Sequence, residues 1–482
     1  MKKLFFAAIF LVAVITLGMA QDDMEAFRFS QNDYEGTARF MGAGGAFSAV
    51  GAEFSALNVN PAAIGVFKKH EITFTPLVLS IYNNNGLYNN NSSRTSNIKF
   101  SLTNAGGVFR FDVKKDNGWK AIQLGFGYNR TCDYNNTYRI EGPSNNSSMM
   151  NKFLAGMQGK TPDQLNDDEY WLYYYYLADT NSLYGDNYYT SLFAEHSKSQ
   201  KLVMESSGAN DEMDFSIGAN YNDKIFIGAT LGVPFISYNE KDKYTETSDE
   251  DITGISDFEY IEDLRVRATG VNLKLGIIYQ PAEFVRVGAA FHTPSYFSRV
   301  RNTYSTTMNC HGNYSTTPTP FESSIYAFNY TLTTPLRAIG SVAFLIKKRA
   351  FVSAEYEFSG MGMSRMSSND YSFDEENEAI QNKYKGCHTV RLGGEVYLSS
   401  NFLLRAGYNF KSSAYRNTVN NNNAMHSVSA GFGFRTKYFF CDFAYIFKTK
   451  NENFWMFDSD YVNPASVKTN IHRVAATIGC KF

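Results

Sequence analysis

Side chains that could carry out catalysis are scattered along this chain of 482 residues. The seven histidines stand far apart, and no H-E-x-x-H helix or nucleophile elbow is present. Gly42-Ala43-Gly44-Gly45 is rich in glycine but lacks the strand-and-helix setting of a phosphate-binding loop. The sequence therefore predicts no catalytic residue and a protein that is not an enzyme.

Patterns that bind metals or cofactors are absent from the sequence as well. The five cysteines are an odd number without a C-x-x-C pair, which favours neither a disulfide framework nor a zinc site. The acidic stretch 246–263 lacks the ligand spacing of an EF-hand and is better interpreted as a solvated loop. Hydrogen bonding is the expected role of the histidines. We predict no metal and no cofactor.

Charged side chains at alternate positions of apolar segments are the remaining candidates for a binding site. Both signs occur among them: Lys274, Arg286, Glu355, Glu357, Arg391, Glu395, Arg405, Arg435, Asp442 and Arg473. Because buried charges need partners, pairing with one another is their default role. The minority hypothesis is that Arg405 and Arg435 bind the carboxylate of an acidic ligand.

The segment from Gly36 to Phe67 ends in Asn60-Pro61-Ala62 and differs in composition from the rest of the chain. It is rich in glycine and alanine and nearly free of charge. Pro61 fixes its own φ and pushes Asn60 toward extended geometry, so the pair makes a stiff corner. We interpret this segment as a compact plug inside a β-barrel that the following residues form.

Composition indicates an exported β-protein. Residues 1–20 are typical of a signal peptide, with two lysines, an apolar run and a small-residue cleavage context. No later apolar stretch approaches about 20 residues, which excludes a helical membrane protein. The aromatic content of 16% suits strands with aromatic girdles, although a soluble β-sandwich shares part of this profile. Without the signal, 43 basic and 47 acidic residues give no support for nucleic-acid binding.

From His70 onward, segments of period two are joined alternately by short and long connections. Such a pattern predicts an all-β fold, an antiparallel transmembrane β-barrel of about fourteen strands, with short turns in the periplasm and long loops outside. The expected strands are 70–82, 98–112, 119–140, 211–222, 224–241, 259–279, 284–305, 325–347, 349–361, 384–399, 401–416, 426–437, 438–449 and 471–482. The expected long loops are 83–97, 141–210, 242–258, 306–324, 362–383, 417–425 and 450–470.

Alternation within the strands predicts which side chains face lipid. Phe126, Phe432 and Ile478 lie on apolar faces whose neighbours are Gly, Ser, Thr or charged residues. The chain also ends on an aromatic residue of such a face, Phe482, which resembles the assembly signal of outer-membrane barrels. That signal implies the barrel-assembly machinery as a partner during insertion.

The long extracellular loop expected at 141–210 contains more than polar residues. Met149, Met150, Phe153, Leu154 and Met157 fall at helical spacing, and Thr161-Pro162-Asp163 is typical of the start of a second helix. An aromatic patch with Trp171 and Tyr174 follows. Two interpretations stay open: the helices pack together as a lid, or the patch is a landing site for apolar ligands.

The segment 36–67, with Asn60-Pro61-Ala62, resembles the N-terminal hatch of the FadL-like family of outer-membrane transporters of hydrophobic compounds, which includes toluene transporters. FLLRAGYNF at 402–410 and HSVSAGFGF at 426–434 are similar to the last strands of that family. The resemblance implies an N-terminal periplasmic segment and plug at 21–69 and a barrel at 70–482. It also implies passive uptake of a ligand that binds first between extracellular loops and leaves sideways when the hatch shifts.

What the resemblance implies about the site is narrower. Asn60, Pro61 and Ala62 are the hatch positions that match residue by residue. Long-chain fatty acids are the expected ligands, with aromatic compounds or haem as alternatives. The resemblance places a monomer among the lipid and lipopolysaccharide of the outer membrane of a Gram-negative bacterium. A barrel that serves protein secretion, or that is a structural docking component, is the alternative function.

Overall fold

The computed structural model describes residues 23–114, 117–144, 147–181, 185, 187–312, 320–347 and 349–482. The signal peptide predicted at 1–20 lies outside the described residues. Fourteen antiparallel strands form a closed barrel, as predicted. The barrel closes where the first strand pairs with the last, for example Leu79 with Val474.

Four of the fourteen strands are interrupted and appear as two consecutive segments each: β2 and β3, β4 and β5, β11 and β12, and β14 and β15. The wall comprises β1 (Glu71–Tyr88), β2 (Asn91–Ser101), β3 (Asn104–Asp112), β4 (Trp119–Asp133), β5 (Asn136–Pro143), β8 (Ser197–Tyr221), β9 (Ile225–Ser248), β10 (Ile255–Ala282), β11 (Val285–His292), β12 (Tyr296–Gly312), β14 (Tyr326–Thr333), β15 (Arg337–Ile346), β16 (Ala350–Gly360), β18 (Gly386–Tyr397), β19 (Phe402–Lys411), β20 (Met425–Arg435), β21 (Phe439–Phe454) and β22 (Ala465–Lys481). Short strands are β6 (Asp179–Thr180), β7 (Tyr189–Thr190), β13 (Phe321–Glu322) and β17 (Arg365–Ser367).

The helices lie at the N-terminus and in the long connections. They are α1 (Asp23–Ser30), α2 (Ala38–Gly42), η1 (Ser55–Asn58), η2 (Pro61–Val66), α3 (Met149–Met157), η3 (Pro162–Gln164), α4 (Asp167–Tyr174), α5 (Leu192–Glu195), α6 (Glu250–Thr253), η4 (Met361–Met363) and α7 (Asp374–Lys383). Among the residues that the structure describes, no helix is both long and apolar enough to cross a membrane.

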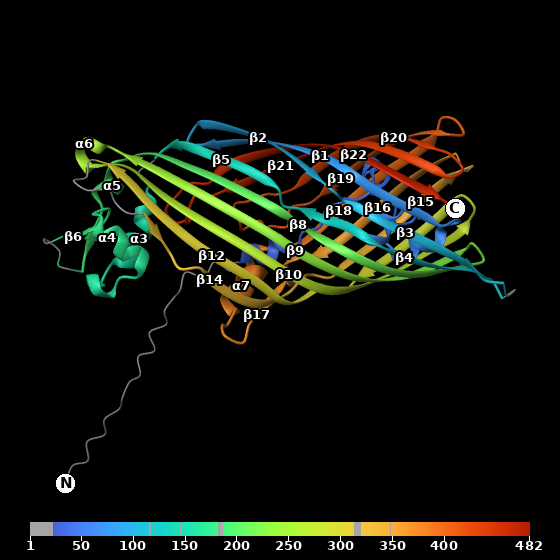
Figure 1. Cartoon of the computed structure of the whole chain (residues 1–482), viewed down its shortest axis with the longest axis horizontal. Coiled ribbons are helices and arrows are strands. Elements are labelled where there is room, and N and C mark those ends of the chain that lie inside the picture. The colour runs from blue at the N-terminus through green and yellow to red at the C-terminus, as the bar shows by residue number, and fades with distance from the viewer. Residues whose placement is uncertain are drawn as a thin grey trace, which may run out of the picture.

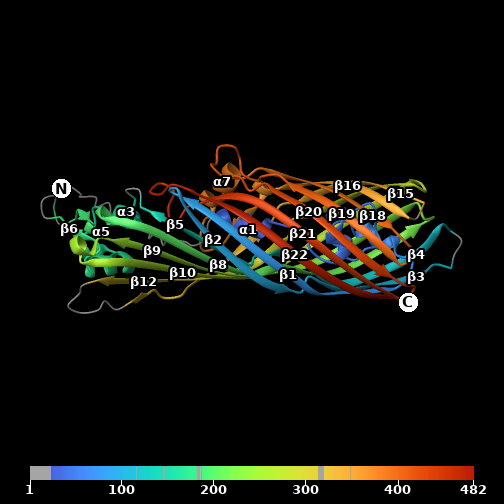
Figure 2. The same cartoon turned by 90° about the horizontal axis from the view of Figure 1, so that it is seen from above.

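Connections of different length lie at opposite ends of the barrel (Figure 1). The end with the C-terminus and short turns such as Asn222-Asp223, called here the turn end, is at the right of Figure 1. The end with α3, α4, α5 and α6, called here the loop end, is at the left. Viewed from above in Figure 2, α7 lies at the edge of the cylinder, and it packs against α1.

The alternation of side chains produces an apolar outer face and a polar inner one. Phe126, Phe432 and Ile478 are about half exposed, whereas Asp442 and Thr477, on neighbouring positions of two strands, are completely buried. The predicted orientation is therefore confirmed for these residues. An outer face of this kind suits lipid, because side chains of period two alternate between bilayer and lumen.

Several strands are longer than the sequence predicted, and the loop expectations at 83–97 and 246–263 are wrong. Most of the acidic stretch 246–263 belongs to β9 and β10. The residues expected as a loop at 83–97 form a hairpin, in which β1 and β2 are joined by Asn89-Asn90. Both asparagines have left-handed backbone with φ of 45° and 65°, a conformation that asparagine tolerates and that a two-residue hairpin turn requires. β8 likewise begins at Ser197, so the long connection spans 144–196, and β9 continues to Ser248.

The helices of this long connection agree only in part with the sequence prediction. α3 covers the residues at helical spacing, as expected, and begins after Ser148, whose side chain accepts a hydrogen bond from the amide of Met150. The second helix does not begin at Thr161-Pro162. That pair opens the single turn η3, and α4 begins after Asn166, which forms a capping box with Glu169.

The N-terminal residues fill the barrel. Residues 36–67, called here the plug, contribute Phe47, Phe54, Leu57 and Ile64 to a buried cluster that also contains inward side chains of the wall. We expected a periplasmic segment before the plug. α1 packs among β12, β14 and α7, where Asp23 accepts hydrogen bonds from Lys383 and from the Tyr384 hydroxyl.

Candidate functional site

Asn60, at the predicted corner, joins three parts of the molecule. Its Oδ1 accepts a hydrogen bond of 3.0 Å from the amide of Ala62 and so caps η2, in which Pro61 is the first residue. Its Nδ2 donates to the carbonyl of Ser48 within the plug at 2.9 Å and to that of Ile277 in β10 at 3.3 Å. Asn60 is completely buried, so this single amide ties the corner to the wall.

Glycines in the wall make room for the plug at the same place. A Cβ on Gly276 would lie 1.9 Å from Asn60 Oδ1, and a Cβ on Gly228 would lie 2.3 Å from the carbonyl oxygen of Pro61. Real Cβ atoms do not approach other atoms so closely, hence larger residues at either position require the corner or the wall to move. The backbone of the plug thus packs directly against the inner face of β9 and β10.

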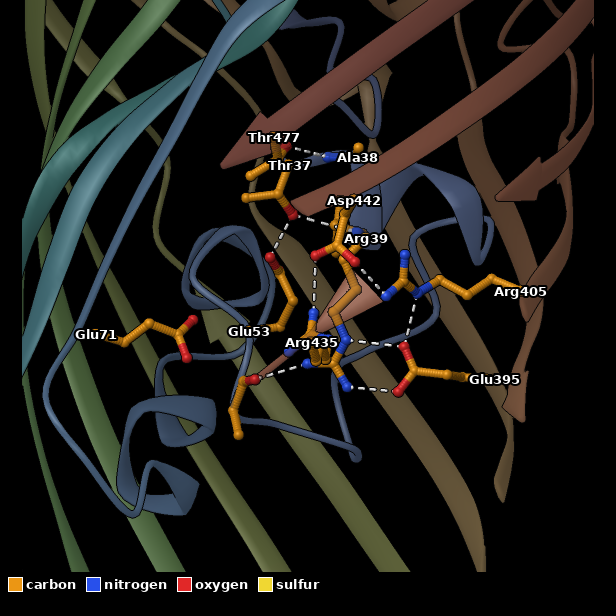
Figure 3. A network of polar contacts seen from close by, with 12 residues as sticks. Thr37, Ala38, Arg39, Glu53, Glu71, Glu395, Arg405, Arg435, Asp442 and Thr477 are labelled. Atoms are coloured by element: carbon orange, nitrogen blue, oxygen red, sulfur yellow. Dashed lines mark hydrogen bonds and ion pairs between the residues drawn. The ribbon is translucent and has the colours of Figure 1, made fainter. Parts of the chain in front are cut away.

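A network of charged side chains anchors the other side of the plug (Figure 3). Arg39 of α2 forms a bidentate ion pair of 2.9 Å with Glu395 of β18. Glu395 also accepts a hydrogen bond of 2.7 Å from Arg405 of β19, which donates at 2.6 Å to Asp442 of β21. Arg435 of β20 donates to the second oxygen of Asp442 at 2.8 Å. Positive and negative charges therefore alternate from the plug through four strands of the wall.

Arg405 and Arg435 were the residues predicted to bind an acidic ligand. The Arg405 side chain is completely buried and bonded to two carboxylates of the chain, and Arg435 is bonded to one. These contacts are the pairing that the sequence favoured as the default role. The Nη1 atom of Arg405 is buried and has no hydrogen-bond partner among the residues described.

Other buried charges fasten the plug at further points. Glu355, held by Arg391 at 2.5 Å, accepts a hydrogen bond of 3.1 Å from the amide of Ser48. Lys274 of β10 bonds to Asn58 of the plug and to Glu212 of β8. The plug is consequently held by hydrogen bonds or ion pairs on several sides of the lumen.

Two carboxyl groups of the N-terminal segment have pKa values shifted in opposite directions. Burial raises the pKa of Glu53 to about 7, although the Thr37 hydroxyl and the Arg39 charge oppose this shift. Burial also acts to raise the pKa of Asp33, but the charges of Lys448 and Arg473 outweigh it and lower the pKa below its usual range. Glu53 is thus the plug carboxyl that changes its charge near neutral pH.

The aromatic residues predicted for ligand binding lie in α4 at the loop end. Trp171 is buried and its ring lies 5.0 Å from that of Tyr175. Tyr174, in contrast, is 61% exposed. Burial of Trp171 is compatible with packing within a lid, and exposure of Tyr174 is compatible with a landing surface, so both interpretations stay predictions.

A pocket of about 230 Å³ lies at the loop end between α3, the inner faces of β8, β9 and β10, and residues 455–458. Much of its lining is apolar: Met204, Tyr244, Tyr260, Trp455, Met456 and Phe457. Asp242 and Glu262 also line it and stand directly opposite one another on β9 and β10. Within the described ranges, no group of three or more His, Cys, Asp or Glu side chains could hold a metal ion.

Sequence reasoning found most of the wall charges of this site but missed three of its other charged residues: Arg39, Glu53 and Asp242. Arg39 and Glu53 were overlooked because the plug as a whole carries so little charge. Asp242 was assigned to a loop, although Tyr238, Asp242 and Tyr244 continue the alternation of β9 on its inner face. That continued alternation was the available signal.

Comparisons with known proteins identify one family by its sequence model and similar folds among solved structures. A family model described as outer membrane protein transport protein (OMPP1/FadL/TodX) matches residues 16–454. A FadL homologue from Pseudomonas aeruginosa has a similar structure, with a TM-score of 0.55, 12% identity and coverage of 94% of this chain and 99% of that one. The toluene transporter TodX of P. putida has a TM-score of 0.53 and 11% identity, with coverage of 93% of this chain and 99% of that one. TbuX, the toluene transporter of Ralstonia pickettii, has a TM-score of 0.51 and 12% identity, with the same coverage of 93% and 99%. No curated protein sequence is a significant match.

Proposed function

Because this chain belongs to the outer membrane protein transport family that includes FadL and TodX, we propose that it takes up hydrophobic compounds passively, with the plug as its gate. The observation that carries this proposal is the position of residues 36–67, packed inside a barrel whose outer face is apolar. Uptake through this barrel requires a route past the plug or a displacement of it.

A protein route of this kind removes a barrier that water imposes. Keeping an alkyl chain hydrated in an open pore costs about 0.8 kcal/mol for each methylene that could otherwise be buried. An apolar path avoids this cost, so a concentration gradient alone can drive transfer. The pocket at the loop end is the proposed first binding site, because apolar and aromatic side chains line it.

The corner Asn60-Pro61-Ala62 is the proposed hinge of the gate. Asn60 connects η2 with β10 and with the preceding part of the plug. When the plug moves, the hydrogen bonds of Asn60 must therefore break, or the groups that they join must move together. Long-chain fatty acids are the ligands that the family resemblance favours. In the proposed setting, the protein acts as a monomer in outer-membrane lipid and lipopolysaccharide, after insertion by the barrel-assembly machinery, and its ligand leaves sideways through the wall.

A disulfide that locks the plug tests the gate. A Cβ on Gly42 of α2 would lie 3.3 Å from the Cβ of Ala444 in β21, close to the separation that a disulfide requires. Gly42→Cys with Ala444→Cys should therefore tether the plug to the wall. We expect uptake of a radiolabelled fatty acid or toluene to stop in oxidised cells and to return after addition of a reductant.

The single variants Gly42→Cys and Ala444→Cys are the matched controls, because neither can form the tether. Both should transport with and without reductant. Unchanged uptake in the oxidised double variant would show that the plug need not move. If no variant loses uptake and deletion of the gene also leaves uptake unchanged, the results favour a role in secretion or docking instead.

A further inference from the structure

The pocket at the loop end combines an aromatic lining with an excess of negative charge. Its aromatic side chains are Tyr244, Tyr260, Trp455 and Phe457, and the rings of Tyr244 and Phe457 meet at 5.5 Å with an interplanar angle of 80°. Asp242, Glu262 and Asp458 line the same pocket, together with one cationic side chain, Lys152. Such a lining is suited to a ligand with an apolar body and a positive charge.

Two of these carboxylates face one another across neighbouring strands. Asp242 and Glu262 are directly opposite in the register of β9 and β10, and like charges in that position are destabilising. Glu262 accepts a hydrogen bond of 2.5 Å from the Tyr304 hydroxyl. The Oδ1 atom of Asp242 is shielded from solvent and has no hydrogen-bond partner among the residues described. Leaving such an acceptor unsatisfied is costly, so this position favours a donor supplied from elsewhere.

Two cationic side chains, Arg28 and Lys152, lie near this pair. Arg28 of α1 bonds to a different carboxylate, Glu240, at 3.4 Å. Lys152 stands on α3 and is a single positive charge against the three carboxylates of the pocket.

We propose that this pocket binds the cationic head of an amphiphilic compound, an alkylammonium, between Asp242 and Glu262. The aliphatic part of the compound packs against the methionine and aromatic side chains, whose ring faces also attract a cation. The inference rests on the proposed function, because it names the class of hydrophobic compound that enters first.

Two other ligand classes suit the pocket less well. A hard metal ion takes oxygen ligands on most sides, whereas this pocket offers mainly ring and thioether surfaces. A fatty acid would add a third carboxylate beside Asp242 and Glu262, with repulsion in place of attraction. The head-group preference is therefore opposite to the one that the family resemblance favours.

A matched series of ligands tests the preference. The full chain in nanodiscs of zwitterionic lipid is titrated calorimetrically with octylammonium, octanol and octanoate, and empty nanodiscs give the background. Octylammonium should bind at least about tenfold more tightly than octanol, and octanoate most weakly. In a double variant, Asp242→Asn with Glu262→Gln, the affinity for octylammonium should fall to that for octanol.

Glu259→Gln is the matched control, because Glu259 lies on β10 but pairs with Lys243 at 2.6 Å rather than lining the pocket. It should bind octylammonium like the parent protein. A second measurement shows whether the double variant has folded: octylammonium should raise the melting temperature of the parent protein and not that of the variant. A double variant that melts at or above the parent temperature is folded, since the change removes repulsion.

The outcomes separate this inference from the proposed function. If octanoate or octanol binds as tightly as octylammonium while the Gly42–Ala444 tether still blocks uptake, transport stands and the head-group preference is wrong. If the double variant retains its affinity for octylammonium, the two carboxylates are not the binding site. If none of the three compounds binds and the tether leaves uptake unchanged, both proposals fail.

Discussion

The buried charges around the plug and those at the loop end are arranged in opposite ways. Near the plug, Arg39, Glu395, Arg405 and Asp442 alternate in sign, and each touches a partner of opposite charge. At the loop end, Asp242 stands opposite another acid. Closed networks of ion pairs hold two elements in one arrangement, whereas an unpaired acid leaves a position for a ligand. The comparison separates a region held by ion pairs from the region where we propose that a ligand binds.

The largest expected effect comes from breaking the network near the plug. Arg405→Met leaves Asp442 and Glu395 buried with one partner fewer each, and we expect a loss of about 3–5 kcal/mol in the free energy of unfolding. Urea titration measures this loss. Arg139→Met, which breaks an exposed pair with Glu141 near the loop end, should cost less than about 1 kcal/mol. Equal losses in the two variants would contradict the contrast between these regions.

A rise in pH should lower the free energy of unfolding by a somewhat smaller amount than Arg405→Met does. The pKa of Glu53 is about 7 in the folded protein and 4.5 for an unperturbed glutamate, so the folded state holds a proton that the unfolded state loses. Stability should therefore fall by up to about 3 kcal/mol as the pH rises from 4.5 to 7, then level off. Urea midpoints across this range measure the slope.

Glu53→Gln is the control for the pH dependence, because it keeps a hydrogen-bond acceptor and removes the titration. Its slope between pH 4.5 and 7 should be clearly smaller than that of the parent protein. Asp33 contributes no slope in this window, since its pKa is lowered below the usual range. An identical slope in the variant would exclude Glu53 as the titrating group.

Overpacking the wall behind the corner should have the next largest effect. Gly276→Ala places a Cβ 1.9 Å from Asn60 Oδ1, which we expect to cost about 1–3 kcal/mol and to shift the plug. Planar-bilayer recordings should then show more frequent openings. Gly340→Ala is the matched control on β15, since its Cβ would meet no atom within 4 Å. Closed, quiet channels in the Gly276 variant would show that the corner does not seal the barrel.

The smallest effect on stability is expected at the loop end. Tyr174→Ser changes an exposed side chain and should alter the free energy of unfolding by no more than about 0.5 kcal/mol. If Tyr174 belongs to a landing surface, initial uptake rates at low ligand concentration should nevertheless fall. Unchanged rates would leave the lid as the remaining interpretation of α4.

The architecture could be predicted from the sequence because every second residue of a membrane-spanning strand faces lipid and must be apolar. Phe126, Phe432 and Ile478 could be oriented from their neighbours alone, without knowledge of any partner strand. The hairpin at Asn89-Asn90 was not found, because asparagine is common both in solvated loops and in two-residue turns. Local composition does not distinguish these two uses.

The site was accessible only in part. The corner Asn60-Pro61 could be recognised from the stiffness of its backbone, but the ion pair between Arg39 and Glu395 joins residues that are 356 positions apart. Periodicity predicts that a side chain points into the lumen. It does not give the position of that side chain along the barrel axis, nor the residue that it faces on the neighbouring strand. For the same reason, the opposition of Asp242 and Glu262 became visible only with the register of β9 and β10.

The closure between β1 and β22 has a consequence for the order in which this protein is made. The plug is among the first parts of the chain to be synthesised, yet Ser429 and Thr477, which bond to Gly44 and Ala38, are among the last. A chain that stops short of β22 leaves one edge of β1 unpaired and lacks the hydrogen bond between Ala38 and Thr477. The last strand therefore completes both the wall of the barrel and one of the contacts that hold the plug.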